Sequence, residues 1–266
     1  MPRADALLVT RGLAPSRAAA RAMIEAGRVL IKVPKGAERS AGETAIVKPS
    51  HDLYDAIELI VVPDEADRYV SRGGLKLAGA LLLSGLSVSG KTCLDVGQST
   101  GGFTDCLLQA GATSVVGVDV GHGQLHPRLA TDERVTCIEG INARALEKSA
   151  LAARQEASQF ELIVADVSFI SLALILPQLP ALLTANGSML LLVKPQFEVG
   201  PENLAKGGVV RDASLYGIVE TRFRTLATEL KLKVRGWFDS PITGGGRGNI
   251  AGNREFFIWT EHDHQS

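Results

Sequence analysis

The sequence predicts an α/β protein, in which a doubly wound, mostly parallel sheet follows a small N-terminal α+β domain. From residue 92 onward, short apolar runs alternate with helical stretches, and unalternated apolar runs are typical of parallel strands covered on both faces. Before residue 65 the chain is basic and combines short helices with short strands. Pro63-Asp64-Glu65 resembles a linker, so we expect domains at 1–62 and 73–266, joined by a linker at 63–72. A chain of 266 residues can give both domains a core.

Five apolar runs are expected to form the parallel strands, because their βαβ spacing is that of a doubly wound sheet. The runs cover 93–96, 115–118, 135–138, 162–165 and 189–193. Two later runs, 233–238 and 255–260, lie close together in the sequence. We expect these two to pair at one edge, so that the sheet has an antiparallel edge strand.

The first segment is strongly basic. Residues 1–36 carry seven basic side chains against two acidic ones, a net charge of +5. This balance suggests a polyanion partner, although a solvated charged face explains it equally well. A helix that begins after Ser16 is expected to turn Ala19, Met23 and Ala26 inward and to place arginines near one face. The basic residues predicted to contact the polyanion are Arg3, Arg11, Arg17, Arg21, Arg28 and Lys32.

The overall composition excludes several classes of protein. A hydrophobic content of 45% with a net charge of −1 is typical of an ordinary soluble protein. The apolar runs are too short for a signal peptide or a membrane span, so we expect a cytoplasmic protein without a membrane partner. The three cysteines form no C-x-x-C pair and the five histidines show no ligand spacing, so we expect no disulfide and no metal. The sequence indicates no oligomeric state.

Two glycine motifs share one predicted strand, and only one of them can be a ligand site. Gly85 to Thr92 matches the phosphate-binding P-loop pattern G-x-x-x-x-G-K-T. A P-loop needs a strand before it and a helix after it, so that the loop amides and helix N-terminus face the phosphates. Here a helix precedes the motif and the strand follows it. We therefore interpret this motif as a helix-to-strand turn at the wrong edge of the sheet for ligands.

The second motif follows the strand and has the context of a cofactor site. Glycines at the end of the strand and the start of a helix let the backbone approach a ligand closely. A dinucleotide fold would also use such a turn, but its G-x-G-x-x-G fingerprint is absent. Asp95 before the turn favours the positively charged S-adenosylmethionine, and Asp119 after the next strand is placed to bind a ribose. The predicted cofactor-binding residues are Asp95, Gly97, Gln98, Ser99, Thr100, Gly101, Gly102, Phe103, Asp119 and Asp166.

Four charged residues, Lys76, Asp166, Lys194 and Glu255, are the predicted catalytic residues. Asp166 and Lys194 follow apolar strands, Lys76 precedes the sheet, and Glu255 opens the last strand. Singly, each is explained as a surface charge, and the two strand-end charges could form a structural ion pair. Together they suit methyl transfer to a sugar hydroxyl. A lysine can stabilise the developing alkoxide or remove the proton, while carboxylates orient the lysine and the hydroxyl.

The chain resembles the TlyA family, known both as haemolysin A and as a ribosomal RNA 2′-O-methyltransferase. The motifs are Y-V-S-R-G-G-L-K-L (69–77), L-D-V-G-Q-S-T-G-G-F-T-D (94–105), V-D-V-G-H-G-Q-L-H (118–126), A-D-V-S-F-I-S-L (165–172), V-K-P-Q-F-E-V-G (193–200), K-G-G-V-V-R-D (206–212) and G-N-R-E-F-F (252–257). The second domain is similar to FtsJ-type enzymes, which implies a Rossmann-like class I methyltransferase fold. The K-D-K-E tetrad of those enzymes corresponds to the four residues above.

The N-terminal segment is similar to the small RNA-binding domain first seen in ribosomal protein S-four. The resemblance implies S-adenosylmethionine as cofactor, cytidine 2′-hydroxyls of ribosomal RNA as substrate, and ribosomal RNA or ribosomal subunits as partner. It also implies that the six basic residues contact RNA.

The chain departs from the family pattern at two places, which keeps other interpretations open. The family usually has alanine where Gln98 stands, and V-L-I-K-V-P-K-G (29–36) replaces a V-N-G-type turn. One alternative is a ribosome-associated RNA-binding factor whose methyltransferase core is inert because of Gln98. The other is a membrane-lysing haemolysin, for which the sequence lacks a long apolar span or a lipid-facing amphipathic helix.

Overall fold

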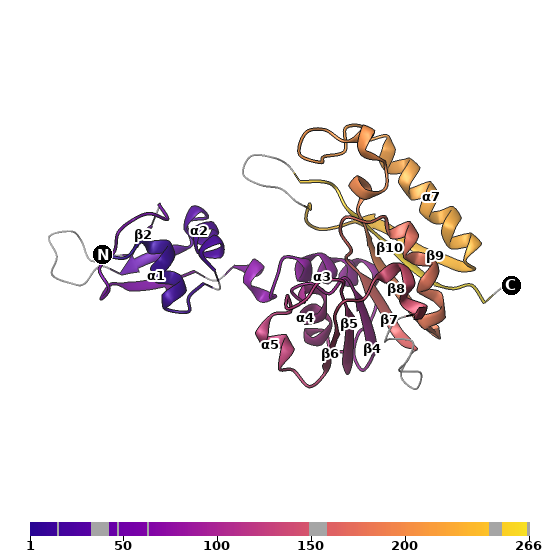
Figure 1. The fold of residues 1–266 in the computed structure, drawn as a ribbon, viewed down its shortest axis with the longest axis horizontal. Helices are drawn as coiled ribbons and strands as arrows, with labels where there is room; N and C mark the ends of the chain where they lie inside the picture. Colours follow the sequence, from indigo (N-terminus) through magenta and orange to yellow (C-terminus); the bar gives the residue numbers. More distant parts are fainter. Residues whose placement is uncertain are drawn as a thin grey trace. The chain divides into compact units, whose positions relative to one another are not determined.

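The structure is a computed structural model that describes residues 1–14, 16–32, 43–46, 48–62, 64–148, 159–244 and 252–264. The chain divides into two compact units, Met1–Asp67 and Arg68–Ser266, each drawn in Figure 1. The division falls within the expected linker, where a single 3₁₀ turn, η1 (Glu65–Arg68), lies. Each unit has its own apolar core.

The smaller unit packs two helices on a three-stranded sheet. Its elements are α1 (Ala4–Thr10), α2 (Arg17–Glu25), β1 (Val29–Lys32), β2 (Glu43–Ala45) and β3 (Glu58–Val61). The strands are antiparallel in the order β2-β1-β3. The predicted inward face of α2 is wrong in part, because Ala20 and Ile24 are the fully buried residues whereas Ala26 is exposed. Ala20 and Ile24 share one face at i, i+4 spacing, and Ala26 already follows the end of the helix. Residues 33–36, the V-P-K-G part of the segment that differs from the family's V-N-G-type turn, lie outside the described residues.

The larger unit is built on a seven-stranded sheet in the order β6-β5-β4-β7-β8-β10-β9. The strands are β4 (Thr92–Val96), β5 (Ser114–Val118), β6 (Val135–Ile138), β7 (Phe160–Ala165), β8 (Leu183–Val193), β9 (Leu232–Asp239) and β10 (Phe256–His262). The first five strands in this order are parallel, and β10 is antiparallel to both of its neighbours. The mostly parallel sheet and the antiparallel pairing of the last two strands at one edge are as predicted, with β9 as the outermost strand and the antiparallel β10 one place inside it. Because Phe257 and Ile258 are fully buried, β10 takes the inner position, and the half-buried β9 forms the edge.

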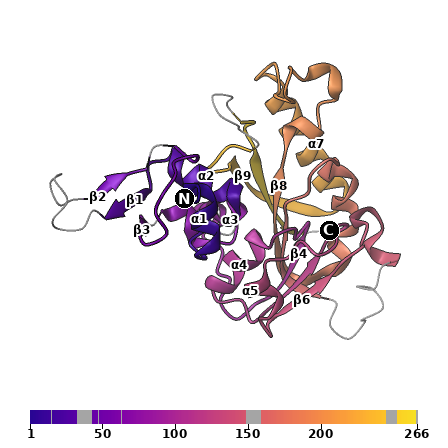
Figure 2. The ribbon, with the colours of Figure 1, turned by 60° about the vertical axis from the view of Figure 1, so that its left-hand side comes forward.

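Helices cover both faces of this sheet (Figures 1 and 2). The helices are α3 (Gly73–Ser84), α4 (Gly102–Gln109), α5 (Pro127–Ala130) and α7 (Leu215–Glu229), with 3₁₀ turns η2 (Ala143–Lys148), η3 (Leu172–Leu174), η4 (Leu176–Gln178), η5 (Pro180–Leu182), η6 (Pro195–Phe197) and η7 (Pro201–Asn203). Along β8, Leu190 and Leu192 pack with residues of α3 and α4, whereas Met189, Leu191 and Val193 pack with residues of α7. Burial on both faces explains the unalternated apolar run of this strand. Helix α7 was not among the predicted elements.

The polarity of β4 separates the two glycine motifs, as predicted. Gly85 ends α3 with a φ of 69°, and Lys91 precedes β4. The P-loop-like segment is therefore the turn that enters β4. Gly97 follows the other end of the strand, at the carboxyl edge where ligands bind to open α/β sheets.

Candidate active site

A cavity of about 250 Å³ lies at the carboxyl edge of the sheet, between the turn after β4, the start of α3 and the ends of β7 and β8. The predicted residues that line it are Lys76, Gly97, Gln98, Ser99, Thr100, Gly102, Phe103, Asp166 and Lys194. Asp95, Gly101, Asp119 and Glu255 are not among its lining residues. The sequence analysis missed Ser71, Arg72, Gly73, Ser168, Thr243 and Gly244. The first four lie within quoted motifs, whereas no motif marked the last two.

Two ion pairs bring the four predicted catalytic residues to this edge. Lys194 Nζ lies 2.5 Å from Asp166 Oδ1 and donates to Ser168 Oγ at 2.7 Å. Lys76 Nζ donates to Glu255 Oε2 at 2.6 Å. The topology explains this meeting. Parallel strands β7 and β8 end at this edge and antiparallel β10 begins there, so residues after the former and before the latter converge.

Burial makes the members of each pair depend on one another. Lys76, Lys194 and Glu255 are all less than a tenth exposed, and a buried charge left without its partner costs several kcal/mol. The Glu255 carboxylate also accepts a hydrogen bond from Gln196 Nε2 at 3.2 Å. Gly244 lies directly beside it, where a Cβ would overlap Oε1. Lys194 and Lys76 thus reach the cavity wall from positions that their carboxylate partners fix.

Glycines shape the turn between β4 and α4. Gly97 has a φ of 83°, and a Cβ at this position would lie 2.7 Å from the carbonyl oxygen of Asp166. A Cβ at Gly102 would overlap Ser71 Oγ. Both positions therefore need glycine for the turn to pack against the end of β7 and the segment before α3.

Asp119 links this turn to the loop that follows β5. Its Oδ2 accepts a hydrogen bond from the Ser99 amide at 2.8 Å, and its Oδ1 accepts one from the Gly121 amide at 2.7 Å. A carboxylate oxygen can accept more than one hydrogen bond, so the carboxylate can still bind a hydroxyl. Its predicted contact with a ribose stays a prediction, and holding the turn is a second role that the sequence did not indicate.

A buried polar chain runs beneath the turn. Gln98 Nε2 donates to Thr104 Oγ1 at 2.9 Å, and Thr104 Oγ1 donates to Asp95 Oδ2 at 2.7 Å. The side-chain amide of Gln98 lies against Gly117 of β5, where a Cβ would overlap it. The residue that departs from the family pattern therefore adds a hydrogen bond under the turn and fills space that glycine leaves open.

The pKa of the Asp95 carboxyl makes the stability of the chain depend on pH. Its burial raises its pKa to about 7, against the opposing hydrogen bond from Thr104 and with a smaller contribution from the carboxylate of Asp166. The same carboxyl has a pKa near 4 in an unfolded chain, so the folded chain binds more protons between about pH 4 and pH 7. The free energy of unfolding should therefore fall as the pH rises through this window. We expect Asp95→Asn to flatten this slope in thermal unfolding of the cofactor-free chain, and an unchanged slope would contradict the assignment.

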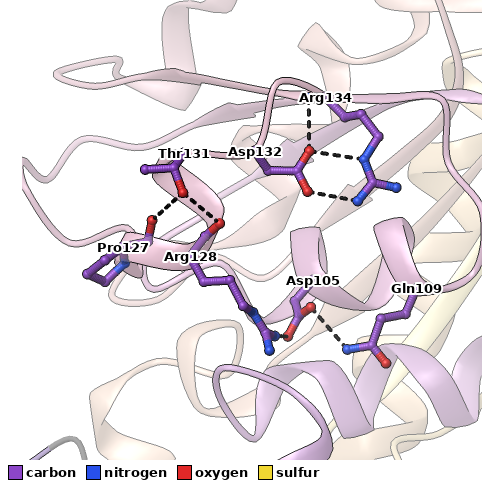
Figure 3. A network of polar contacts seen from close by, with 7 residues as sticks. All are labelled: Asp105, Gln109, Pro127, Arg128, Thr131, Asp132 and Arg134. Atoms are coloured by element: carbon purple, nitrogen blue, oxygen red, sulfur yellow. Dashed lines mark hydrogen bonds and ion pairs between the residues drawn. The ribbon is translucent and has the colours of Figure 1, made fainter.

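Asp105 ties α4 to two flanking segments. Its carboxylate accepts hydrogen bonds from Gln109 Nε2 at 3.0 Å, Arg128 Nη2 at 2.7 Å and the Val70 amide at 2.8 Å. Figure 3 shows Arg128 and Gln109 converging on it. Because Val70 directly precedes the cavity-lining segment 71–73, Asp105 holds that wall of the cavity against α4. Its only signal in the sequence was its place at the end of the 94–105 motif.

The six basic residues predicted to contact RNA all have partners within the smaller unit. Arg28 points inward, with 14% of its side chain exposed, and donates to the carbonyl of Val62. Arg11 donates to backbone carbonyls, and Lys32 pairs with Glu58 at 3.1 Å. The remaining three, Arg3, Arg17 and Arg21, converge on Asp5. Their contact with RNA stays a prediction.

Two family models match the chain. The FtsJ-like methyltransferase model matches residues 69–262, and the S4 domain model matches residues 2–31. The 16S/23S rRNA (cytidine-2′-O)-methyltransferase TlyA of Mycobacterium tuberculosis is 43% identical over 258 residues, which are 97% of this chain and 88% of that protein. This chain belongs to the TlyA family.

Relatives within the TlyA family carry two kinds of name. Hemolysin A of Brachyspira hyodysenteriae is 36% identical over 96% of this chain and 100% of that protein. A structure from Streptococcus thermophilus, described as a candidate hemolysin, superposes with a TM-score of 0.72 at 38% identity, covering 99% of this chain and 89% of that one. The predicted family and fold class are confirmed. As a TlyA family member with an FtsJ-like domain, the chain is an enzyme of the methyltransferase class.

The described residues contain neither a helix long and apolar enough to cross a membrane nor a group of three or more His, Cys, Asp or Glu that could hold a metal. The three cysteines are free thiols. Burial raises the pKa of Cys93 and of Cys106 to about 12, so neither thiol is a nucleophile near neutral pH.

Proposed function

We propose that this chain transfers a methyl group from S-adenosylmethionine to the 2′-hydroxyl of cytidines in ribosomal RNA. The observation that carries the proposal is the meeting of two lysine–carboxylate pairs near the glycine turn, in which both lysines and Glu255 are buried. The name of the Mycobacterium tuberculosis relative supports the substrate. A ribosomal RNA substrate also agrees with the expected cytoplasmic location.

The residues around the turn fit a cationic cofactor. Asp95 and Asp166 are two carboxylates close enough to influence each other's ionisation, and Asp95 Oδ1 is a buried oxygen that has no hydrogen-bond partner among the described residues. Clustered carboxylates oppose each other's ionisation, and a positive charge beside them relieves that cost. When bound, S-adenosylmethionine supplies a methyl group activated on a positively charged sulfur. We propose that the turn at 97–103 holds this cofactor and that Asp119 binds its ribose.

The two ion pairs supply what a ribose hydroxyl needs in order to act as a nucleophile. Lys194 is held by Asp166 and Ser168, so its ammonium can donate a further hydrogen bond to the oxygen on which negative charge develops. The hydroxyl proton would pass to the Asp166 carboxylate while the bond between the hydroxyl oxygen and the methyl carbon forms and the methyl–sulfur bond breaks, which leaves the electron pair on a neutral sulfur. Lys76, fixed by Glu255, holds the ribose in line from the other wall of the cavity.

Phe169 offers a surface on which the target base can stack. It follows Asp166 by three residues, is 91% exposed and has a φ of 65°. Its ring lies 5.6 Å from that of Phe197. A non-glycine residue in the left-handed region carries strain that persists where function requires it, and unpaired bases stack on exposed aromatic rings.

We therefore expect Phe169→Ala to lower methylation efficiency at least fivefold, since stacking on an aromatic ring is worth about 1–3 kcal/mol per base. Phe169→Tyr, which keeps the ring, should retain most activity. The measurement is the initial rate of methyl incorporation against RNA concentration. Equal activity of the alanine and tyrosine variants would show that the target base does not stack on Phe169.

The experiment that tests the proposed function maps 2′-O-methyl groups on ribosomal RNA from cells with and without this chain, and after incubation of the purified chain with subunits and S-adenosylmethionine. We expect new 2′-O-methylcytidine at defined positions only when both the chain and the cofactor are present. RNA binding without methyl incorporation on either subunit would instead support the binding-factor alternative.

A further inference from the structure

Three arginines of the smaller unit are anchored on one buried carboxylate. Asp5 of α1 is fully buried. Arg3 reaches it with Nε and Nη2, each at 3.1 Å, and Arg17 Nη2 and Arg21 Nε of α2 reach it at 3.3 Å. The hydrogen bonds from Arg3 hold the pKa of Asp5 well below its usual range, so the carboxylate is ionised at neutral pH.

The side chains of these three arginines are nevertheless exposed to solvent. The exposed fractions of the Arg3, Arg17 and Arg21 side chains are 41%, 59% and 55%. A guanidinium has five N–H donors, and Arg17 and Arg21 each use one of their nitrogens on Asp5. Each therefore keeps N–H groups for an anion. Three positive charges against Asp5 leave a net charge of +2, and Asp52 is a further carboxylate that acts on Arg3.

This arrangement separates these arginines from the other predicted RNA contacts. Arg28 is mostly buried and donates to a backbone carbonyl, and Arg11 donates to the carbonyl of Ile57. A long exposed side chain ordinarily loses rotamer freedom when it binds a ligand, which lowers affinity. The Asp5 anchor removes part of that cost, because the three guanidinium groups are already gathered at one point.

We propose that Asp5 is a positioning residue, which pre-organises the guanidinium groups of Arg3, Arg17 and Arg21 for the contact with RNA phosphates that is expected of them. The inference rests on the proposed function, since it names how the smaller unit would hold the ribosomal RNA substrate. Its consequence runs against simple charge counting. Asp5 is acidic, yet it should strengthen the binding of a polyanion.

The test compares two substitutions that each remove one negative charge from the same unit of the full chain. Asp5→Asn frees the three arginines, and we expect it to weaken binding to extracted ribosomal RNA by about 3- to 10-fold, the size of one lost charge-assisted contact. Glu58→Gln acts on the exposed pair with Lys32 and leaves the cluster intact. We expect it to leave binding unchanged or to tighten it slightly, as charge counting predicts.

A second variant guards against loss of folding in Asp5→Asn. Arg17→Lys/Arg21→Lys changes two side chains that are more than half exposed and keeps every charge. Lysine lacks the planar fork of arginine, so we expect binding to fall about threefold or more, with thermal unfolding close to that of the parent chain. A surface that binds through charge alone would show no change.

The outcomes separate this inference from the proposed function. If the parent chain itself fails to bind ribosomal RNA above a non-ribosomal RNA of equal length, the RNA-binding role of the smaller unit fails, and the inference fails with it. If the parent chain binds while Asp5→Asn binds equally or more tightly, or the double lysine variant binds unchanged, the positioning role of Asp5 is overturned and the proposed function stands.

Discussion

Lys194→Ala is expected to slow methyl transfer by about 10²–10⁴-fold while cofactor binding is retained. Lys194 is the cation that its two partners, Asp166 and Ser168, hold at the cavity wall. Proton transfer and charge stabilisation by a positioned side chain contribute about 10²–10⁴-fold to a rate, so we expect kcat to fall by that factor. The measurement is single-turnover methyl incorporation at saturating cofactor. Cofactor binding, followed by calorimetry, should change little because the glycine turn is untouched.

The substitution also leaves the Asp166 carboxylate without its cation, so stability must be measured beside activity. Lys194→Arg keeps the charge and should keep the fold, yet we expect it to remain strongly impaired because a guanidinium does not reproduce the point charge and proton chemistry of lysine. The matched control is Lys91→Ala, which removes the lysine of the P-loop-like turn at the opposite edge of the sheet. It should leave kcat unchanged. A folded Lys194→Ala chain within tenfold of the parent rate would end the catalytic assignment of Lys194.

The position of the site could be predicted from the sequence because it follows from strand polarity. Asp166 and Lys194 come after apolar runs of parallel strands, and such residues meet at one edge wherever the strands lie in the sheet. The sequence allows an ion pair between Asp166 and Lys194, because both follow predicted parallel strands, and these strands are neighbours in the sheet. The pairing of Lys76 with Glu255 could not be predicted in the same way, since it forms because β10 inserts beside β8 in the opposite direction. The strand order β8-β10-β9 depends on which of the last two strands is buried on both faces, and the spacing of the strands in the sequence does not show which one is.

The sequence did not reveal contacts made by residues that are common at such positions, such as an acidic residue in a basic segment or a glycine in a strand. Asp5 lowers the charge of a basic segment when charges are counted, but the packing of α1 on α2 makes it the anchor of that segment's arginines. Asp105 looked like the polar end of a motif, and only the fold brings Val70 and Arg128 to it. Gly117 is an ordinary strand residue in the sequence, although Gln98, against which it lies, departs from the family pattern.

Gly117 and Gln98 lead to the second prediction with a large expected effect, which concerns stability. Gly117 lies in β5 between Asp95 of β4 and Cys137 of β6, so its backbone cannot move without disturbing two neighbouring strands. A Cβ at Gly117 would overlap the side-chain amide of Gln98, which is 3% exposed and bonded to Thr104. Overpacking a buried site typically costs about 1–3 kcal/mol. We expect Gly117→Ala to fall within this range and to lower the Tm by several degrees, because the buried Gln98 amide would have to move and give up its hydrogen bond to Thr104.

A double-mutant cycle tests the cause of that loss. Gln98→Ala alone removes the hydrogen bond to Thr104 and should cost about 1 kcal/mol. In the Gln98→Ala background the space beside Gly117 is free, so Gly117→Ala should become nearly neutral. The two substitutions should therefore be less harmful together than the sum of their separate effects, with a coupling energy of about 1–2 kcal/mol. Thermal unfolding of the four chains, with and without S-adenosylmethionine, measures it.

The control for this cycle is Gly217→Ala in α7, where a Cβ would meet nothing within 4 Å. It should be neutral or stabilising, since alanine favours a helix over glycine by about 1 kcal/mol. If Gly117→Ala is equally harmful with either residue at position 98, then strand packing, and not the glutamine, requires the glycine. If the cycle shows the expected coupling and the Gln98→Ala chain still methylates RNA, the two residues form a matched pair. The long side chain at position 98 is then accommodated beneath the cofactor turn by the missing side chain on β5, and no loss of catalysis needs to accompany it.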